Sequence, residues 1–168
     1  MFDKMRRARR DLATMQALFP RAEQIARDDE IDQPGAEHLL LAALDLDDGI
    51  ARSALGMLDI DAAALRAAIT GQHAEALRSV GVVADDNAIA AALPATADPK
   101  GPYRAQGSLQ TAFQRAVELA SGDKSPLHSG HLLLAITEVG AGTVARALEH
   151  LGVDRVLLRD HALRLCAR

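Results

Sequence analysis

The chain has 168 residues, of which 49% are hydrophobic but only 2% aromatic, and its formal net charge is −4. This balance is typical of a folded soluble protein and excludes a wholly disordered chain. Aromatic and β-branched residues favour strands, whereas the abundant Ala, Leu, Arg and Glu favour helices. The composition therefore predicts an all-α fold, in one ordinary domain or two very small ones.

The first ten residues form a basic segment with one acidic residue, Asp3. Its cations are Lys4, Arg6, Arg7, Arg9 and Arg10. The segment contributes about +4 to the net charge of −4, which leaves about −8 for the rest of the chain. We expect residues 1–14 to form a short helix with its basic face in solvent, and a contact with nucleic acid or another acidic partner is the alternative. The expected packing face holds Phe2, Met5, Leu12 and Met15.

Four helices are predicted between residues 15 and 80. The first contains Phe19 and has Pro20 in its first turn, where the missing N–H costs nothing. Asp61 has the character of an N-cap for the fourth helix. The second, third and fourth helices are expected over about residues 36–46, 49–58 and 61–78.

A linker is predicted over residues 81–107. Its helix-breaking residues are Pro94, Pro99, Gly101, Pro102 and Gly107. Residues 88–93 are expected to form at most one weak helical turn, and part of this long loop is expected to be mobile. Four more helices follow, over about residues 109–121, 130–139, 143–151 and 154 to near the end. Ser129 is predicted to cap the second of these, and Asp154 the fourth.

The two sets of helices are copies of one unit. A shift of 93 positions aligns His38 with His131 and the triplet Leu39–Leu41 with Leu132–Leu134. Further identical pairs are Gly49/Gly142, Leu55/Leu148, Leu58/Leu151, Asp61/Asp154, Leu65/Leu158 and Arg66/Arg159. Upstream, a shift of 94 aligns Phe19/Phe113, Arg21/Arg115, Ala22/Ala116 and Ala26/Ala120. We interpret residues 15–80 and 108–168 as two repeats that pack as one domain, because each is too small to be secure alone.

Short motifs recur in both repeats. They are Gly35-Ala36-Glu37-His38-Leu39-Leu40-Leu41, Leu148-Glu149-His150-Leu151-Gly152-Val153-Asp154, Phe19-Pro20-Arg21-Ala22 and Phe113-Gln114-Arg115-Ala116. In this order, and in duplicate, they resemble the Clp N-terminal (Clp-N) repeat over about residues 15–165. The resemblance implies two tandem four-helix repeats related by pseudo-twofold symmetry, as in the N domains of ClpA- and ClpC-type AAA+ unfoldases.

The resemblance also implies a domain that docks substrates and adaptors for an ATP-driven unfolding ring. The sequence contains no Gly-Lys dipeptide and therefore no Walker A phosphate loop. We expect a non-catalytic, monomeric protein- or peptide-binding module of the Clp pathway that needs no cofactor. The length and Met1 favour a stand-alone module over an excised domain. The alternative is a DNA-associated regulator that uses the basic arm.

In ClpC-like members the resemblance implies a phosphoarginine pocket at the start of the second helix of a repeat. A helix N-terminus attracts phosphate, and a carboxylate can pair with the guanidinium. The matching positions are Ala36 and Glu37 in the first repeat and Ser129 and Gly130 in the second, so each repeat keeps half of the pattern. The alternative is that Glu37 and Ser129 only serve the first turn of their helices.

An apolar groove for adaptors and cyclic peptides is also implied, and we expect Phe19 and Tyr103 to line it. A core position for Phe19 is the alternative. His38 and His131 are expected to pack and hydrogen-bond locally rather than bind a metal, because zinc needs three or four converging ligands. No catalytic set stands out.

The number of cysteines and the length of the apolar runs indicate the cellular compartment and whether the chain spans a membrane. Cys166 is the only cysteine, so no internal disulfide is possible, which fits a reducing cytoplasm. The sequence contains no run of eighteen apolar residues of the kind that spans a membrane. We therefore expect a cytoplasmic protein.

Overall fold

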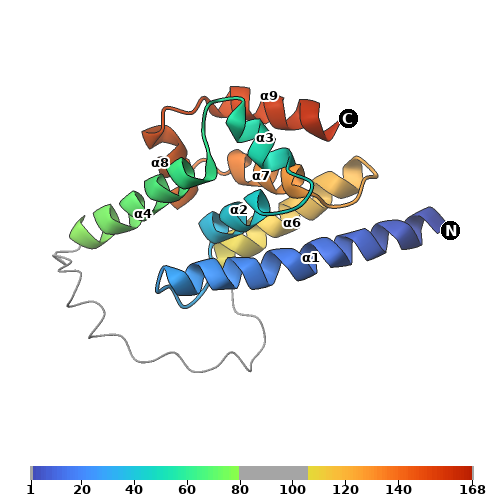
Figure 1. Ribbon diagram of the computed structural model, residues 1–168, viewed down its shortest axis with the longest axis horizontal. Coiled ribbons are helices and arrows are strands. Elements are labelled where there is room, and N and C mark those ends of the chain that lie inside the picture. The colour runs from blue at the N-terminus through green and yellow to red at the C-terminus, as the bar shows by residue number, and fades with distance from the viewer. Residues whose placement is uncertain (1, 80–105, 168) are drawn as a thin grey trace.

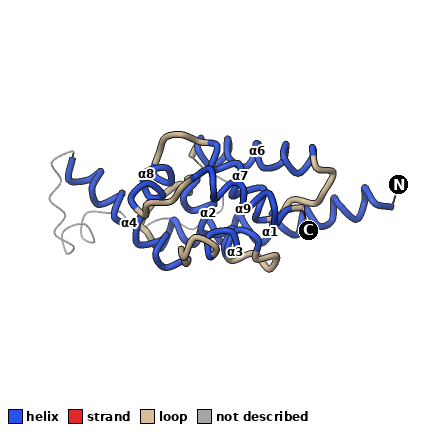
Figure 2. The backbone as a smooth tube through the Cα atoms, turned by 90° about the horizontal axis from the view of Figure 1, so that it is seen from above, coloured by secondary structure: helices blue, strands red, loops and turns tan. Residues whose placement is uncertain are grey.

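Helices and short connections make up the part of the chain that the computed structural model describes, residues 2–79 and 106–167 (Figure 1). In order they are α1 Phe2–Asp28, α2 Ala36–Leu44, α3 Ile50–Gly56, α4 Ala62–Ser79, α6 Gly107–Gly122, α7 Ser129–Glu138, α8 Thr143–His150 and α9 Arg155–Cys166. The described residues contain no strand, and the prediction of an all-α fold is confirmed (Figure 2). The predicted linker and its helical turn lie outside the described residues, apart from its end, where Gly107 already begins α6.

The helix α1 is continuous over 27 residues. The prediction of a short basic helix separate from the first helix of the repeat is therefore wrong. Pro20 lies inside α1 and not in its first turn. No glycine or proline interrupts residues 2–19, so nothing ends the helix before Pro20. An internal proline removes one backbone hydrogen bond, and packing of α1 on the rest of the fold offsets that cost.

The N-terminal half of α1 is held by polar contacts with the second repeat. Arg7 donates to the carbonyl of Ala120 at 3.0 Å, and Thr14 donates to the carbonyl of Leu127 at 3.1 Å. Asp11 accepts from the N–H of Leu127 at 2.7 Å. Spacings of four and three residues put these three side chains on one helix face.

The expected apolar packing face of this segment is therefore wrong for two of its members. Met5 is 52% exposed and Leu12 is 54% exposed. Met15 is half-buried. The helix turns its polar residues toward the body because backbone groups of Ala120 and Leu127 face it there, and polar side chains hydrogen-bond to them.

The central helices α2 and α7 carry the core. Residues Glu37–Leu44 and Ser129–Thr137 are all buried. One apolar cluster contains buried residues of both repeats. The repeats also meet through α4 on α8 and through α3 on α9 (Figure 1).

Equivalent contacts recur in the two repeats. Arg21 pairs with Asp45 and Arg115 pairs with Glu138, each at 2.6 Å. Two of the predicted N-caps, Asp61 and Asp154, are also confirmed. Asp154 accepts from two N–H groups at the start of α9, and Asp61 accepts from the N–H of Ala64 at 2.7 Å. These contacts fix the same helix arrangement twice.

None of the described helices is by itself long and apolar enough to cross a membrane. Only α7 and α8 taken together pass that length and composition test, across a bend of 91°.

Candidate functional site

His38 and His131 hold the starts of α2 and α7 in the same way. The N–H of Gly35 donates to Nδ1 of His38 at 2.9 Å, and the N–H of His128 donates to Nδ1 of His131 at 3.3 Å. Both rings are fully buried, and burial lowers the pKa of both imidazoles. Each histidine takes the place of the Glu or Gln of a capping box. The prediction that they pack and hydrogen-bond locally is confirmed.

An aspartate faces the other nitrogen of each ring. Nε2 of His38 lies 3.6 Å from Asp29, and Nε2 of His131 lies 3.4 Å from Asp123. Because each Nδ1 accepts a hydrogen bond, the neutral ring carries its proton on Nε2 and points it toward the carboxylate. Asp29 and Asp123 are 94 positions apart, so the shift that aligned Phe19 with Phe113 would have found them.

Glu37 is buried at the start of α2. Its Oε1 lies 3.5 Å from Nε2 of His73 on α4 and 3.7 Å from Nδ1 of His38. Burial by itself raises the pKa of the Glu37 carboxyl, but hydrogen bonds from His73 and from its own backbone outweigh burial and hold the pKa below its usual value. The side chain is therefore a carboxylate, placed where the partial positive charge of the α2 N-terminus stabilises it.

Ala36 has lost the hydroxyl of the family pattern, but a hydroxyl reaches its position from another helix. The N–H of Ala36 donates to Oγ of Ser108, on the first turn of α6, at 3.3 Å. Sequence reasoning missed Ser108. The only signal in the sequence is that Ser108 lies 94 positions after Thr14. The Thr14 hydroxyl likewise reaches the other repeat, where it donates to the carbonyl of Leu127. The first repeat thus combines a carboxylate and a hydroxyl at one helix start.

The start of α7 is occupied by a carboxylate from the first repeat. The backbone N–H of Ser129 donates to Asp48 at 3.0 Å, and its hydroxyl donates to the same carboxylate. The Ser129 oxygen in turn accepts from the N–H of Ala51 at 2.9 Å. Asp48 also accepts from the N–H of Ile50 at 3.0 Å. Asp48 and Ser129 therefore join the starts of α3 and α7 across the two repeats.

The predicted cap by Ser129 is wrong. The N-cap of α7 is His128, and Ser129 is the first helical residue, fully buried. Its hydroxyl serves α3 instead of its own helix. The sequence gives no sign of this, because the contact depends on how the repeats meet.

Gly130 lies where neighbouring side chains leave no room. A Cβ at this position would lie 2.5 Å from Sγ of Cys166 and 2.7 Å from Cγ2 of Ile50. Glycine is therefore required by close packing, and the equivalent of the Glu37 carboxylate has no space in the second repeat. Burial raises the pKa of the Cys166 thiol to about 11, so this neighbour is uncharged. The four predicted phosphoarginine positions therefore have different surroundings in the two repeats: Ala36 and Glu37 have a carboxylate and a hydroxyl at the start of α2, whereas Ser129 is bound to Asp48 and Gly130 is closely packed.

Phe19 is half-buried at the contact between α1 and α6. Its ring centroid lies 4.9 Å from that of Phe113, and both rings pack against the core cluster. On the same two helices, Leu12 of α1 and Val117 of α6 are 54% and 43% exposed. We call this surface the α1–α6 seam, defined by Leu12, Met15, Phe19, Phe113 and Val117. Tyr103 lies outside the described residues.

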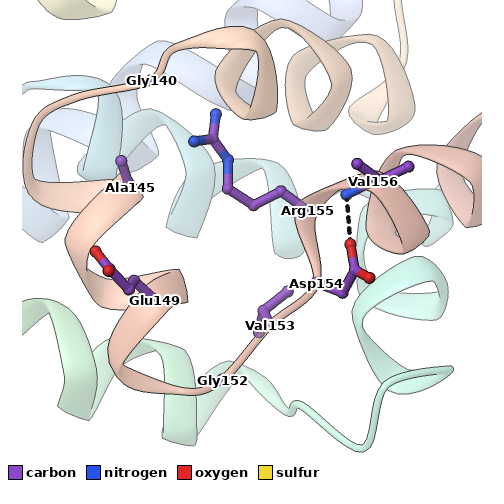
Figure 3. A pocket seen from close by; sticks show the side chains of 8 residues that line it. All are labelled: Gly140, Ala145, Glu149, Gly152, Val153, Asp154, Arg155 and Val156. Atoms are coloured by element: carbon purple, nitrogen blue, oxygen red, sulfur yellow. Dashed lines mark hydrogen bonds between the residues drawn. The ribbon is translucent and has the colours of Figure 1, made fainter.

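Shallow hollows on the described surface include two that are lined in part by charged residues. The first, of about 510 Å³, is lined by Lys4, Arg6, Arg7, Arg10, Lys124 and Pro126, and we call it the basic hollow. The second, of about 390 Å³, lies between the α7–α8 connection and the start of α9 (Figure 3). There Arg155 is committed to the carbonyl of Val139 at 2.7 Å, and Asp154 caps α9. None of the predicted site residues lines either hollow.

The described residues contain no group of three or more His, Cys, Asp or Glu side chains placed to hold a metal ion. His128 and His131 stack at a centroid distance of 3.7 Å.

Comparison with known proteins identifies the fold. The model of the Clp repeat (R) N-terminal domain matches residues 13–96, which is half of the chain. A similar solved structure is the crystal structure of the N-terminal domain of the caseinolytic protease associated chaperone ClpD from Arabidopsis thaliana. It aligns with a TM-score of 0.55 and 20% identity, over 95% of this chain and 93% of that chain.

No curated protein matches the chain. Clp-N domains are non-catalytic interaction domains that bind proteins of Clp pathways. The family match covers half of the chain, and the arrangement of the helices agrees with a solved member. The chain belongs to the Clp-N family.

Proposed function

We propose that this chain binds substrates or adaptors of the Clp pathway through the α1–α6 seam. The observation that carries the proposal is the exposure of Leu12 and Val117 on the two helices whose Phe19 and Phe113 rings meet. Both come from the helices that open the two repeats. An apolar surface formed by two elements is a more specific feature than single exposed apolar residues, which are common.

Energetics support a peptide ligand at this place. Full burial of one Leu or Val side chain contributes about 1.5–3 kcal/mol. The aromatic pair is already ordered by the core, so the protein loses little conformational entropy when a ligand covers it. Because Leu12 and Val117 are only about half exposed, covering them suits a weak, reversible contact.

The test is the affinity of the full chain for an unfolded protein. Fluorescein-labelled casein, titrated and followed by anisotropy, should bind saturably. The double variant Leu12→Asp/Val117→Asp should weaken binding about tenfold or more, because two charges replace the apolar surface. Val156→Asp is the matched control, because Val156 is 71% exposed and lies on α9, away from the seam.

Two outcomes would contradict the proposal. One is the absence of saturable binding by the parent chain. The other is an equal loss in Val156→Asp and in the double variant, which would mean that any added negative charge repels the ligand.

A second candidate is phosphoarginine binding at the start of α2. It is supported by the Glu37 carboxylate, which can pair with a guanidinium, and by the Ser108 hydroxyl beside the N–H of Ala36. Calorimetric titration with free phosphoarginine tests it. Heat that is lost in Glu37→Ala and kept in Glu75→Ala, an exposed carboxylate on α4, would support this site; no heat from the parent would rule it out.

A further inference from the structure

The basic hollow gathers cations from two distant parts of the chain. Lys4, Arg6, Arg7 and Arg10 come from the first turns of α1, and Lys124 comes from the α6–α7 turn. In two views the first turns of α1 project past the end of α6 (Figures 1 and 2). We propose that this hollow binds an acidic peptide segment of a partner protein, at a site separate from the α1–α6 seam.

The positions of the cations do not favour helix stability. The N-terminus of a helix carries a partial positive charge, so Lys4 in the first turn of α1 is repelled by the helix dipole, and the closely spaced cations of α1 repel one another. Arg7 has an acidic neighbour, Asp11, at 3.9 Å. Within the described segments, no ion pair involves Lys4, Arg6, Arg10 or Lys124. Four charges therefore remain available to a ligand.

Specific contacts hold the two walls of the hollow together. Arg7 bonds to the carbonyl of Ala120, and Asp11 bonds to the N–H of Leu127, on either side of Lys124. Lys124 itself has φ 54°, a left-handed conformation that usually falls to Gly or Asn. Its equivalent 94 positions earlier, Glu30, has φ 58° and the opposite charge. The turn is common to both repeats, and only the second repeat places a cation on it.

The cations on α1 also lie outside the part that the family model covers. The match begins at residue 13, whereas Lys4–Arg10 precede it. The match to the family model therefore does not account for these charges.

Charge and shape favour an acidic peptide over other polyanions. Residues beyond the basic segment sum to about −8, which would repel the long, uniformly charged surface of a DNA duplex or an anionic membrane. A concave site between a helix and a turn suits a narrow segment whose Glu and Asp side chains enter it. Such a contact would be strengthened by low salt.

The experiment uses the full chain and a fluorescein-labelled peptide of alternating Glu and Ala, with the Gln version of the peptide as control. Anisotropy should show saturable binding of the Glu peptide that weakens as salt is raised. Arg10→Glu and Lys124→Glu should each lower the affinity about tenfold, because each turns an attraction into a repulsion. Arg146→Glu, an exposed cation on α8, changes the net charge equally and should shift the affinity less than about twofold.

Three outcomes would overturn the proposal. The first is equal binding of the Glu and Gln peptides. The second is an equal loss in all three variants, which would indicate long-range attraction without a site. The third is tighter binding of a DNA duplex or of phosphatidylglycerol vesicles than of the peptide, with the same dependence on Arg10 and Lys124. The uncharged seam variant Leu12→Ser/Val117→Ser separates the two functions, since it should weaken casein binding and leave the charge of the basic hollow unchanged.

Discussion

At the scale of single residues, the buried imidazoles are the groups most sensitive to solution conditions. His38 and His131 accept backbone hydrogen bonds through Nδ1, and protonation would destroy these bonds. His128 stacks on His131 and has a buried Nδ1 that finds no partner in the described part of the chain. Burial lowers the pKa of His128 to about 4. The starts of α2 and α7 therefore depend on neutral rings.

Acid should destabilise the fold in the range set by these histidines. Their pKa in the unfolded chain is about 6.5, so below that pH the unfolded state binds more protons than the folded state. The free energy of unfolding should be constant above about pH 6.5 and should fall as the pH drops toward 4. The lowered pKa of Glu37 adds a loss in the same direction, below its ordinary value of 4.5.

Urea unfolding at a series of pH values measures this effect. The decrease in unfolding free energy between pH 6.5 and pH 4 should become smaller in the variant His128→Gln. It should persist in His150→Gln, because the His150 side chain is exposed on α8. A midpoint that stays constant or rises between pH 6.5 and pH 4 would contradict the argument.

Site residues could be predicted only where the signal is local. Glu37, His38 and His131 were found because a short motif repeats in the sequence, and their surroundings agree with it. Asp48 was not found, because its role depends on a contact with Ser129, 81 positions away. The requirement for glycine at position 130 could not be predicted either, because it arises from the close packing of Cys166 and Ile50 against this position. Packing between repeats leaves no mark on residue spacing.

At the scale of elements, a buried set of hydrogen bonds links α3 of the first repeat to α7 of the second. The Ser129 hydroxyl is buried and serves both Asp48 and Ala51. By contrast, Ser108 is exposed and makes one contact of 3.3 Å, to the N–H of Ala36. Two serines at helix starts therefore differ greatly in what they contribute.

Removal of the two hydroxyls should show this difference. Ser129→Ala leaves the N–H of Ala51 and the Asp48 carboxylate short of a partner, and it should lower the free energy of unfolding by about 1–3 kcal/mol. Ser108→Ala is the matched control and should change it by about 0.5 kcal/mol or less. Chemical denaturation compares them, and equal losses would mean that water replaces the Ser129 hydroxyl in the variant.

Most helices could be predicted because they have local start and stop signals. Asp61 and Asp154 cap α4 and α9 as expected. The error at α1 has a physical cause, because Pro20 was taken as a helix start whereas the chain upstream has strong helix formers and no break. Contacts of Arg7 and Thr14 with the second repeat support the longer helix, and they are invisible in the sequence.

At the scale of the whole molecule, both repeats draw on one core. Leu40 on α2 and Leu133 on α7 are fully buried, and they belong to the same apolar cluster. Two units of this size would each bury too little apolar area to be stable alone. The repeats should therefore unfold together in one cooperative transition.

Truncation of a central side chain tests this coupling. Leu133→Ala should lower the free energy of unfolding by about 2–5 kcal/mol. Amide hydrogen exchange should then accelerate in α2 of the first repeat as well as in α9 of the second. Leu157→Ala is the control, because Leu157 is 41% exposed and should have little effect. Faster exchange confined to the second repeat would show that the halves unfold independently.

The N-terminal extension of α1, which projects beyond the end of α6 (Figures 1 and 2), affects how many copies of a ligand the molecule can bind. A strictly twofold protein is divalent, because each surface occurs twice. Here α6 begins at Gly107, which corresponds to residue 13 of α1, and Gln106 before it has an extended backbone, so α6 carries no counterpart of residues 2–12. Among residues 2–79 and 106–167, a ligand that needs those eleven positions finds a single site. The duplication thus supplies a symmetric scaffold, while the longer first helix predicts one copy of that ligand for each copy of the described fold.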